Sequence, residues 1–98
     1  MTDHRVRTRI PAEFKAGGVS GKGEVRNVSD GGLFVRTLAI PEEGASVAVR
    51  MREPGKAAVE VSGLVWWTAR AGREGRAGFG LRVLDEDEAY RRLVASVR

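Results

Sequence analysis

The sequence predicts a mostly β protein, a small antiparallel barrel of about six strands followed by one C-terminal helix. Apolar and polar residues alternate over several short stretches, which is the pattern of strands with one buried face. Glycine and proline, present 13 and 3 times, separate these stretches and favour turns. A length of 98 residues suits one hydrophobic core, so we expect a single domain over residues 1–98.

Six stretches with strand character are expected to form the barrel, over residues 10–84. The clearest is 45–53, where Val47, Val49 and Met51 share one face. The expected strands are 10–15, 23–28, 32–37, 45–53, 57–68 and 76–84.

Glycines inside two of these stretches predict local departures from a regular strand. Gly63, within 57–68, is expected at a bend or bulge. Gly78 and Gly80 lie opposite the apolar face of 76–84. At these two positions either another group approaches the backbone closely or the strand curves.

The final segment, 85–98, is expected to be a helix. Asp85 and Glu88 have the spacing of a capping box. The apolar residues fall at i, i+3, i+4 and i+7, which makes one stripe on a helix. We expect this stripe to pack across one opening of the barrel or against its outer face. It consists of Tyr90, Leu93, Val94 and Val97.

The composition excludes several classes of function. Cysteine is absent, which excludes disulfides and thiolate metal sites. His4 is the only histidine, so a histidine-based triad or multi-histidine metal site cannot form, and we expect no enzyme, metal or catalytic cofactor. No apolar run could cross a bilayer, so we expect a cytoplasmic protein without a membrane partner. The net charge of +4 favours an anionic partner, such as a nucleotide, a nucleic acid or an acidic protein.

Small polar residues and glycines gather between the second and third expected strands. Asn27 and Ser29 are two residues apart, so on a strand they present an amide and a hydroxyl on the same face. Gly31 and Gly32 follow and can take the positive φ that tight turns often need. On its own this pattern also fits a turn that only reverses the chain.

Three arginines, Arg5, Arg7 and Arg9, precede the first expected strand, in a tail (1–9) that we expect to be flexible until something holds it. Arginine suits a phosphorylated purine because its planar fork matches phosphate oxygens, pairs with guanine O6 and N7, and stacks on a base. On their own, these arginines also fit a solvated basic tail.

Together the two patterns resemble the motifs of the PilZ domain family: Arg-x-x-x-Arg at 5–9 and Asn-x-Ser-x-x-Gly at 27–32. The stretches 63–67 and 78–83 resemble the later strands of that family, and the resemblance covers nearly the whole chain. It implies a small β-barrel with a C-terminal helix. Many members bind the bacterial second messenger cyclic di-GMP, which carries two guanines and two phosphates.

The resemblance also implies roles for individual residues. The two motif arginines would bind phosphates and guanine edges and stack on a base, and the amide and hydroxyl would hydrogen-bond to the other side of the ligand. His4 lies where, in the family, the residue influences whether one ligand or a stacked pair is bound. The implied ligand-binding residues are Arg5, Arg9, Asn27, Ser29 and Gly32, and the auxiliary positions are His4, Arg7, Asp30 and Gly31.

Two adjacent tryptophans are expected to face opposite sides of their strand. Trp67 shares its face with Val61 and Val65 and is expected in the core. Trp66 would then face outward, either packed beneath the helix or available to stack on a base or a partner.

The expected function is a non-enzymatic receptor whose arginine tail folds over the barrel when cyclic di-GMP binds. Because only four residues precede Arg5, we expect the signal to pass to a separate effector protein. One alternative is a PilZ-like adaptor that makes protein contacts without binding the nucleotide. A less favoured alternative is a small basic barrel that binds single-stranded nucleic acid through its arginines and Trp66. The basic residues outside the tail are scattered, so a nucleic-acid partner is not expected.

Overall fold

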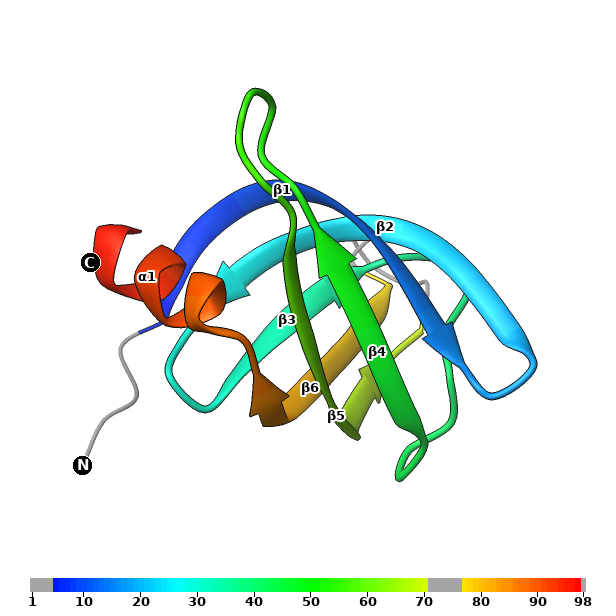
Figure 1. Ribbon diagram of the computed structural model, residues 1–98. Helices are drawn as coiled ribbons and strands as arrows, with labels where there is room; N and C mark the ends of the chain where they lie inside the picture. Colours follow the sequence, from blue (N-terminus) through cyan, green and yellow to red (C-terminus); the bar gives the residue numbers. More distant parts are fainter. Residues whose placement is uncertain (1–4, 71–76, 98) are drawn as a thin grey trace.

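The computed structural model describes residues 5–70 and 77–97, which form six strands and one helix (Figure 1). The elements are β1 (Val6–Ala16), β2 (Val19–Val28), β3 (Gly32–Arg36), β4 (Ser46–Met51), β5 (Val59–Ala69), β6 (Gly78–Glu86) and α1 (Glu88–Val97). The strands pair antiparallel and close into a barrel in the order β1-β2-β3-β6-β5-β4. The predicted fold class, a six-stranded antiparallel barrel with a C-terminal helix, is confirmed.

β1 begins at Val6 rather than at the predicted residue 10, so residues 6–9 are part of the first strand of the barrel. That this segment is flexible until a ligand holds it stays a prediction. The arginines of this segment are exposed, whereas Val6 and Thr8 are half-buried. The hydroxyl of Thr8 donates to the carbonyl oxygen of Val25 at 2.7 Å. The exposed arginines give the segment a polar composition, but their alternation with half-buried residues is that of a strand with one solvent-exposed face. Residues 1–4 lie outside the described residues.

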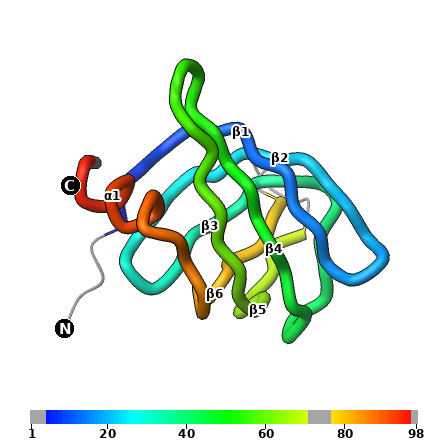
Figure 2. Tube along the Cα trace, in the orientation of Figure 1, coloured from blue at the N-terminus to red at the C-terminus, as the bar shows by residue number. Residues whose placement is uncertain are grey.

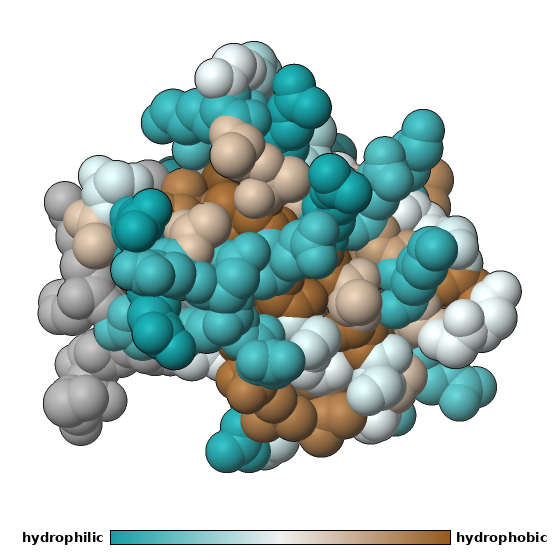
Figure 3. All heavy atoms as spheres, viewed as in Figure 1, coloured by the Kyte–Doolittle hydropathy of each residue, from teal (hydrophilic) through white to brown (hydrophobic). Residues whose placement is uncertain are grey.

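The interior of the barrel holds the hydrophobic core. Phe14 and Phe79 pack edge to face there, with ring centroids 5.1 Å apart and planes at 72°, an arrangement that aromatic rings favour. On the face shown in Figure 3, hydrophilic side chains cover much of the surface and hydrophobic side chains show between them. The largest fully buried hydrophobic side chains are Tyr90, Phe79, Leu33, Met51, Val25, Val28, Val35, Val47, Val49 and Val94.

The pairing of β5 with β6 is interrupted by two bulges. Between Ser62 and Gly63 the register shifts by one residue of β6, so the irregularity expected at Gly63 is present, but the extra residue belongs to the partner strand. A second shift lies between Val65 and Trp67. A bulge sets two successive residues opposite one partner and so interrupts the alternation of side chains. The prediction that Trp67 belongs to the core is therefore wrong, and its side chain is 38% exposed.

Trp67 packs on the outside of the barrel instead. Its ring lies nearly parallel to that of Phe34, with centroids 5.1 Å apart and planes at 13°. It also crosses Gly80, where a Cβ atom would overlap the indole, so the close approach considered at this glycine is confirmed. Trp66 is 62% exposed, so it is not packed beneath the helix. The guanidinium carbon of Arg82 lies 5.2 Å from the centroid of the Trp66 ring.

The N-cap of α1 is Asp87, and the prediction that Asp85 caps the helix is wrong. Oδ1 of Asp87 accepts a hydrogen bond from the backbone nitrogen of Tyr90 at 2.9 Å, which satisfies one of the free donors of the first turn. Asp85 instead pairs with Ser62, because β6 continues to Glu86 before the helix begins.

α1 packs its apolar stripe on the barrel. Tyr90, Leu93 and Val94 are buried in the same cluster as the barrel interior. The side chain of Val97 is not among those described. Figure 2 shows α1 at one side of the barrel, with the turn between β4 and β5 projecting beyond the strands. None of the helices in the described part of the chain has the length and hydropathy needed to cross a bilayer.

Candidate functional site

The turn between β2 and β3 is closed by hydrogen bonds from Ser29. Its backbone nitrogen donates to the carbonyl oxygen of Gly32 at 2.8 Å, and its hydroxyl donates to the same oxygen at 3.2 Å. Ser29 has an exposed fraction of 0%. In this structure the hydroxyl therefore shapes the turn, and a direct hydrogen bond from it to a ligand would need a different turn conformation.

Gly32 is required where β3 packs beside β6. A Cβ atom at this position would lie 2.5 Å from the carbonyl oxygen of Leu81, so only glycine allows the two backbones to approach this closely. Neither Gly31 nor Gly32 uses a positive φ, because the described glycines with positive φ lie in other turns. Gly31 is exposed and has open space around it.

The two sequence motifs meet through Arg5 and Asn27. Nη1 of Arg5 donates to Oδ1 of Asn27 at 2.9 Å, across 22 residues of chain. The pairing of β1 with β2 makes this contact, because Arg7 lies directly opposite Asn27 in the register. The predicted proximity of the arginine segment and the polar turn is thus present in the barrel.

A broad groove lies on the outer face beside this contact. Its volume is about 1000 Å³, at the upper end of the range of small-molecule sites. Four arginines from three strands surround it, together with the stacked rings of Phe34 and Trp67. We call this the arginine groove; it is lined by Arg7, Thr8, Arg9, Arg26, Asn27, Phe34, Arg36, Trp67 and Ala69.

A smaller cavity of about 190 Å³ is also lined by Trp67. Its wall includes Arg82 over the ring of Trp66, a cation–π arrangement. We call this the tryptophan pocket; it is lined by Arg5, Gly31, Gly32, Leu33, Trp66, Trp67, Gly80, Leu81 and Arg82.

Four of the five predicted binding residues are divided between these two cavities, whereas the buried Ser29 lines neither of them. Arg9 and Asn27 line the arginine groove, whereas Arg5 and Gly32 line the tryptophan pocket. The hydrogen bond from Arg5 to Asn27 connects the two cavities at one edge. Trp67 lines both cavities.

Two of the four auxiliary residues also line these cavities. Arg7 lines the arginine groove and Gly31 the tryptophan pocket. Asp30 is exposed on the turn. His4 lies outside the described residues.

Sequence reasoning missed two arginines of the groove. Arg36 is two residues after Phe34 on β3, so the alternation of a strand places both on the outer face. Arg26 precedes Asn27 on β2, at a shift in the β2–β3 register. Its guanidinium also lies 3.3 Å from the Glu24 carboxylate, which offsets part of its charge. The period of the third strand could have indicated Arg36, but nothing in the sequence indicates the shift that places Arg26.

A third cavity, of about 790 Å³, opens where β1, β2, β4 and β5 meet the end of β6. It is lined by more acidic than basic residues, so its charge does not favour an anion. Its acidic residues are Glu13, Glu60, Asp85, Glu86 and Asp87, and its basic residues are Lys15, Lys22 and Arg50.

Tyr90 reaches from α1 to the turn between β2 and β3. Its hydroxyl donates to the carbonyl oxygen of Ser29 at 2.7 Å and to that of Gly32 at 3.1 Å. Burial, reinforced by the nearby Glu86 carboxylate, raises the pKa of the Tyr90 phenol well above its ordinary value of 10.0. The phenol therefore stays a hydrogen-bond donor in the folded protein well into the alkaline range.

This pKa predicts how stability changes at alkaline pH. In the unfolded chain Tyr90 ionises near pH 10, whereas in the folded barrel it stays neutral, so its contribution is complete below pH 10 and is lost as the pH rises further. The free energy of unfolding should fall by about 1.4 kcal/mol per pH unit from this group alone.

Tyr90 is the only tyrosine, so phenolate absorbance reports it directly. The absorbance should rise near pH 10 in urea, but in buffer only together with loss of circular dichroism. A rise near pH 10 with the folded spectrum intact would contradict the burial argument.

Comparison with known proteins agrees with this architecture. The sequence model of the PilZ domain matches residues 2–97. No curated protein matches the chain. Among solved structures, the inhibitor of motility MotI/DgrA of Bacillus subtilis is similar in fold, with a TM-score of 0.80 and 14% identity. The match covers 99% of this chain and 49% of that one, so this chain spans about half the length of its structural relative. The family match extends over essentially the whole chain, which therefore belongs to the PilZ domain family.

Proposed function

We propose that this domain is a receptor for cyclic di-GMP that relays occupancy to a separate protein in the bacterial cytoplasm. The observation that carries the proposal is the hydrogen bond between Arg5 and Asn27, which joins the two motifs at the edge of the arginine groove. Domains of this family are generally non-catalytic receptors. The signal is therefore carried by binding and by the surface that binding creates.

The chemistry of the two cavities suits a ligand with two phosphates and two guanines. Guanidinium groups bind phosphate oxygens and guanine edges in pairs, and Arg7, Arg9 and Arg36 place three of them around one groove. The ring of Trp67 stacks on that of Phe34 and lines both cavities. A base stacked on such a ring contributes about 1–3 kcal/mol.

Fewer residues become ordered on ligand binding than if the whole N-terminal segment were flexible. Residues 6–9 already belong to β1, so the change centres on side chains and on Arg5 at the start of the strand. Arg5 either keeps its bond to Asn27 or exchanges it for a ligand oxygen. Less order is then gained on binding, and less conformational entropy is lost.

The relay requires a partner protein. MotI/DgrA, whose fold is similar, is an inhibitor of motility. For this chain we propose action on another protein, to which the domain presents a surface that changes when the ligand binds. The exposed face around Trp66 and Arg82 borders the tryptophan pocket, so a ligand in that pocket changes the surface that a partner meets.

Isothermal titration calorimetry of the wild-type protein with cyclic di-GMP tests the proposal. We expect saturable binding, accompanied by a change in tryptophan fluorescence because both tryptophans border the cavities. Cyclic di-AMP is the matched control: it carries the same phosphates but lacks guanine O6, and should bind more weakly.

Two other results would point elsewhere. No heat at high micromolar nucleotide, with a folded circular dichroism spectrum, would favour an adaptor that works through protein contacts alone. Salt-sensitive oligonucleotide binding that cyclic di-GMP does not displace would favour a single-strand binder.

A further inference from the structure

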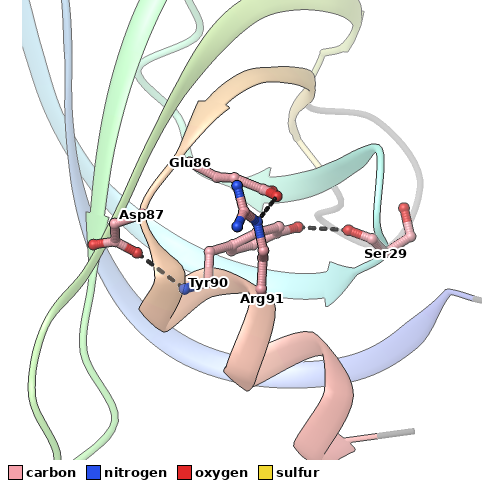
Figure 4. Close-up of polar contacts among 5 residues, drawn as sticks. All are labelled: Ser29, Glu86, Asp87, Tyr90 and Arg91. Atoms are coloured by element: carbon pink, nitrogen blue, oxygen red, sulfur yellow. Dashed lines mark hydrogen bonds and ion pairs between the residues drawn. The ribbon is translucent and has the colours of Figure 1, made fainter.

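The C-terminal helix reaches into the turn between β2 and β3 through one side chain. Figure 4 shows Tyr90 extending from α1 with its hydroxyl at Ser29. The hydroxyl lies 2.7 Å from the carbonyl oxygen of Ser29 and 3.1 Å from that of Gly32. A phenol has one proton, so the two carbonyls share it. Tyr90 has an exposed fraction of 0%, so water does not compete at this contact.

The two carbonyls that Tyr90 holds flank the part of the turn that faces the cavities. Gly31 lies between them and lines the tryptophan pocket with Gly32. Asn27, which accepts from Arg5, is two residues before Ser29. The position of these carbonyls therefore fixes the backbone that carries the polar half of the binding site.

Tyr90 is itself held firmly by the start of the helix. The backbone nitrogen of Tyr90 donates to Oδ1 of Asp87 at 2.9 Å, and Oδ2 of Asp87 accepts from the backbone nitrogen of Glu60 at 3.1 Å. One turn of helix later, Nε of Arg91 lies 2.9 Å from Oε1 of Glu86 (Figure 4). Strands β5 and β6 thus fix the position of the N-terminal end of α1. Because the Tyr90 hydroxyl extends from this end, its hydrogen bonds restrict the position of the turn carbonyls.

We propose that Tyr90 is a positioning residue of the nucleotide site, acting through the carbonyls of Ser29 and Gly32. The proposal rests on the proposed function, cyclic di-GMP binding. It has a reciprocal consequence: if docking of α1 strengthens nucleotide binding, the nucleotide strengthens docking of α1 by the same factor. The helix is then the element on which occupancy of the site can be detected.

The first test is Tyr90→Phe, which keeps the ring in the core and removes only the hydroxyl. Affinity for cyclic di-GMP should fall about three- to tenfold, the effect of one hydrogen bond. The matched control is Thr37→Val, which removes another buried hydroxyl that donates to a carbonyl, that of Lys22 at 2.8 Å, and that also accepts from the backbone nitrogen of Ala39 at 3.1 Å. Thr37 lines neither cavity. Thr37→Val should leave the affinity within about twofold of the wild type. Equal affinities in Tyr90→Phe and the wild type, or equal losses in the two variants, would overturn the proposal.

The second test is amide hydrogen exchange of the turn. The Ser29 amide, which donates to Gly32, should exchange faster in Tyr90→Phe than in Thr37→Val. This readout does not depend on the nucleotide. If the wild type binds no cyclic di-GMP, the proposed function fails, and exchange at Ser29 alone decides whether Tyr90 holds the turn: faster exchange supports that role and unchanged exchange overturns it.

The third test needs no variant, so it holds even if Tyr90→Phe does not fold. In the wild type, saturating cyclic di-GMP should slow amide exchange in α1 beyond the slowing seen in β4, which reports global stabilisation. Equal slowing in the two elements would mean that the helix does not respond to the site, and would overturn the coupling.

Discussion

Replacing Arg5 and Arg9 together by alanine should weaken cyclic di-GMP binding at least a hundredfold. Each guanidinium that meets a charged ligand contributes about 1.5–3 kcal/mol, so each single replacement should cost about tenfold or more. Because Arg5 and Arg9 line different cavities, we expect them to contact separate parts of the ligand, so that the two losses add approximately. Ser29→Ala should be milder, because the Ser29 hydroxyl is buried and donates to Gly32.

Calorimetry on the two single variants and the double variant measures these effects. Arg50→Ala is the matched control, because it removes the same charge from β4, where Arg50 is exposed and 3.9 Å from Glu60. It should bind nearly as the wild type does. If Arg50→Ala lost as much affinity as Arg5→Ala, net charge rather than contact would be responsible, and unchanged affinity in both motif variants would contradict the site.

Phe79→Ala should remove about 3–5 kcal/mol from the free energy of unfolding, the cost of emptying a large aromatic site in a core. The Phe79 ring is fully buried and packs edge to face on Phe14. A domain of this size is typically stable by about 5–15 kcal/mol, so the variant should unfold at a much lower urea concentration. Urea unfolding followed by circular dichroism measures the change.

Phe34→Ala is the comparison for this prediction, since it deletes the same ring on the outer face. It should cost clearly less stability than Phe79→Ala, because Phe34 is only half-buried. It should nevertheless weaken nucleotide binding, because Trp67 loses the ring on which it stacks. A greater loss of stability in Phe34→Ala would show that the outer stack, rather than the interior, holds the barrel together.

The fold was predictable because its signal is local. A strand with one buried face repeats every two residues, and this period, together with the glycines and prolines that separate the stretches, located six strands along the chain. The start of β1 was missed because arginines alternate with Val6 and Thr8, and a polar composition conceals such a period. The N-cap of the helix was predicted at the wrong residue because Asp85 and Asp87 are both acidic. The end of β6, which the sequence does not indicate, determines that Asp87 is the cap.

The remaining differences arise from contacts between distant parts of the chain. The bulge that turns Trp67 outward depends on how β5 pairs with β6, and no periodic pattern indicates a shift of register. The resemblance of the two motifs correctly predicted that Arg5 lies near the polar turn. The contact of Tyr90 with that turn spans 61 residues, and in the sequence Tyr90 is simply one member of an apolar stripe.

The circular strand order described above also limits how this domain can meet other proteins. Each strand of the ring has a neighbour on both sides, so the sheet offers little open edge for adding a foreign β-strand. Peptide capture by sheet extension, and the edge-to-edge aggregation that shares its chemistry, are therefore disfavoured. A partner protein would therefore have to recognise side chains on the outer wall or on the helix, which are the surfaces that the proposed nucleotide would alter.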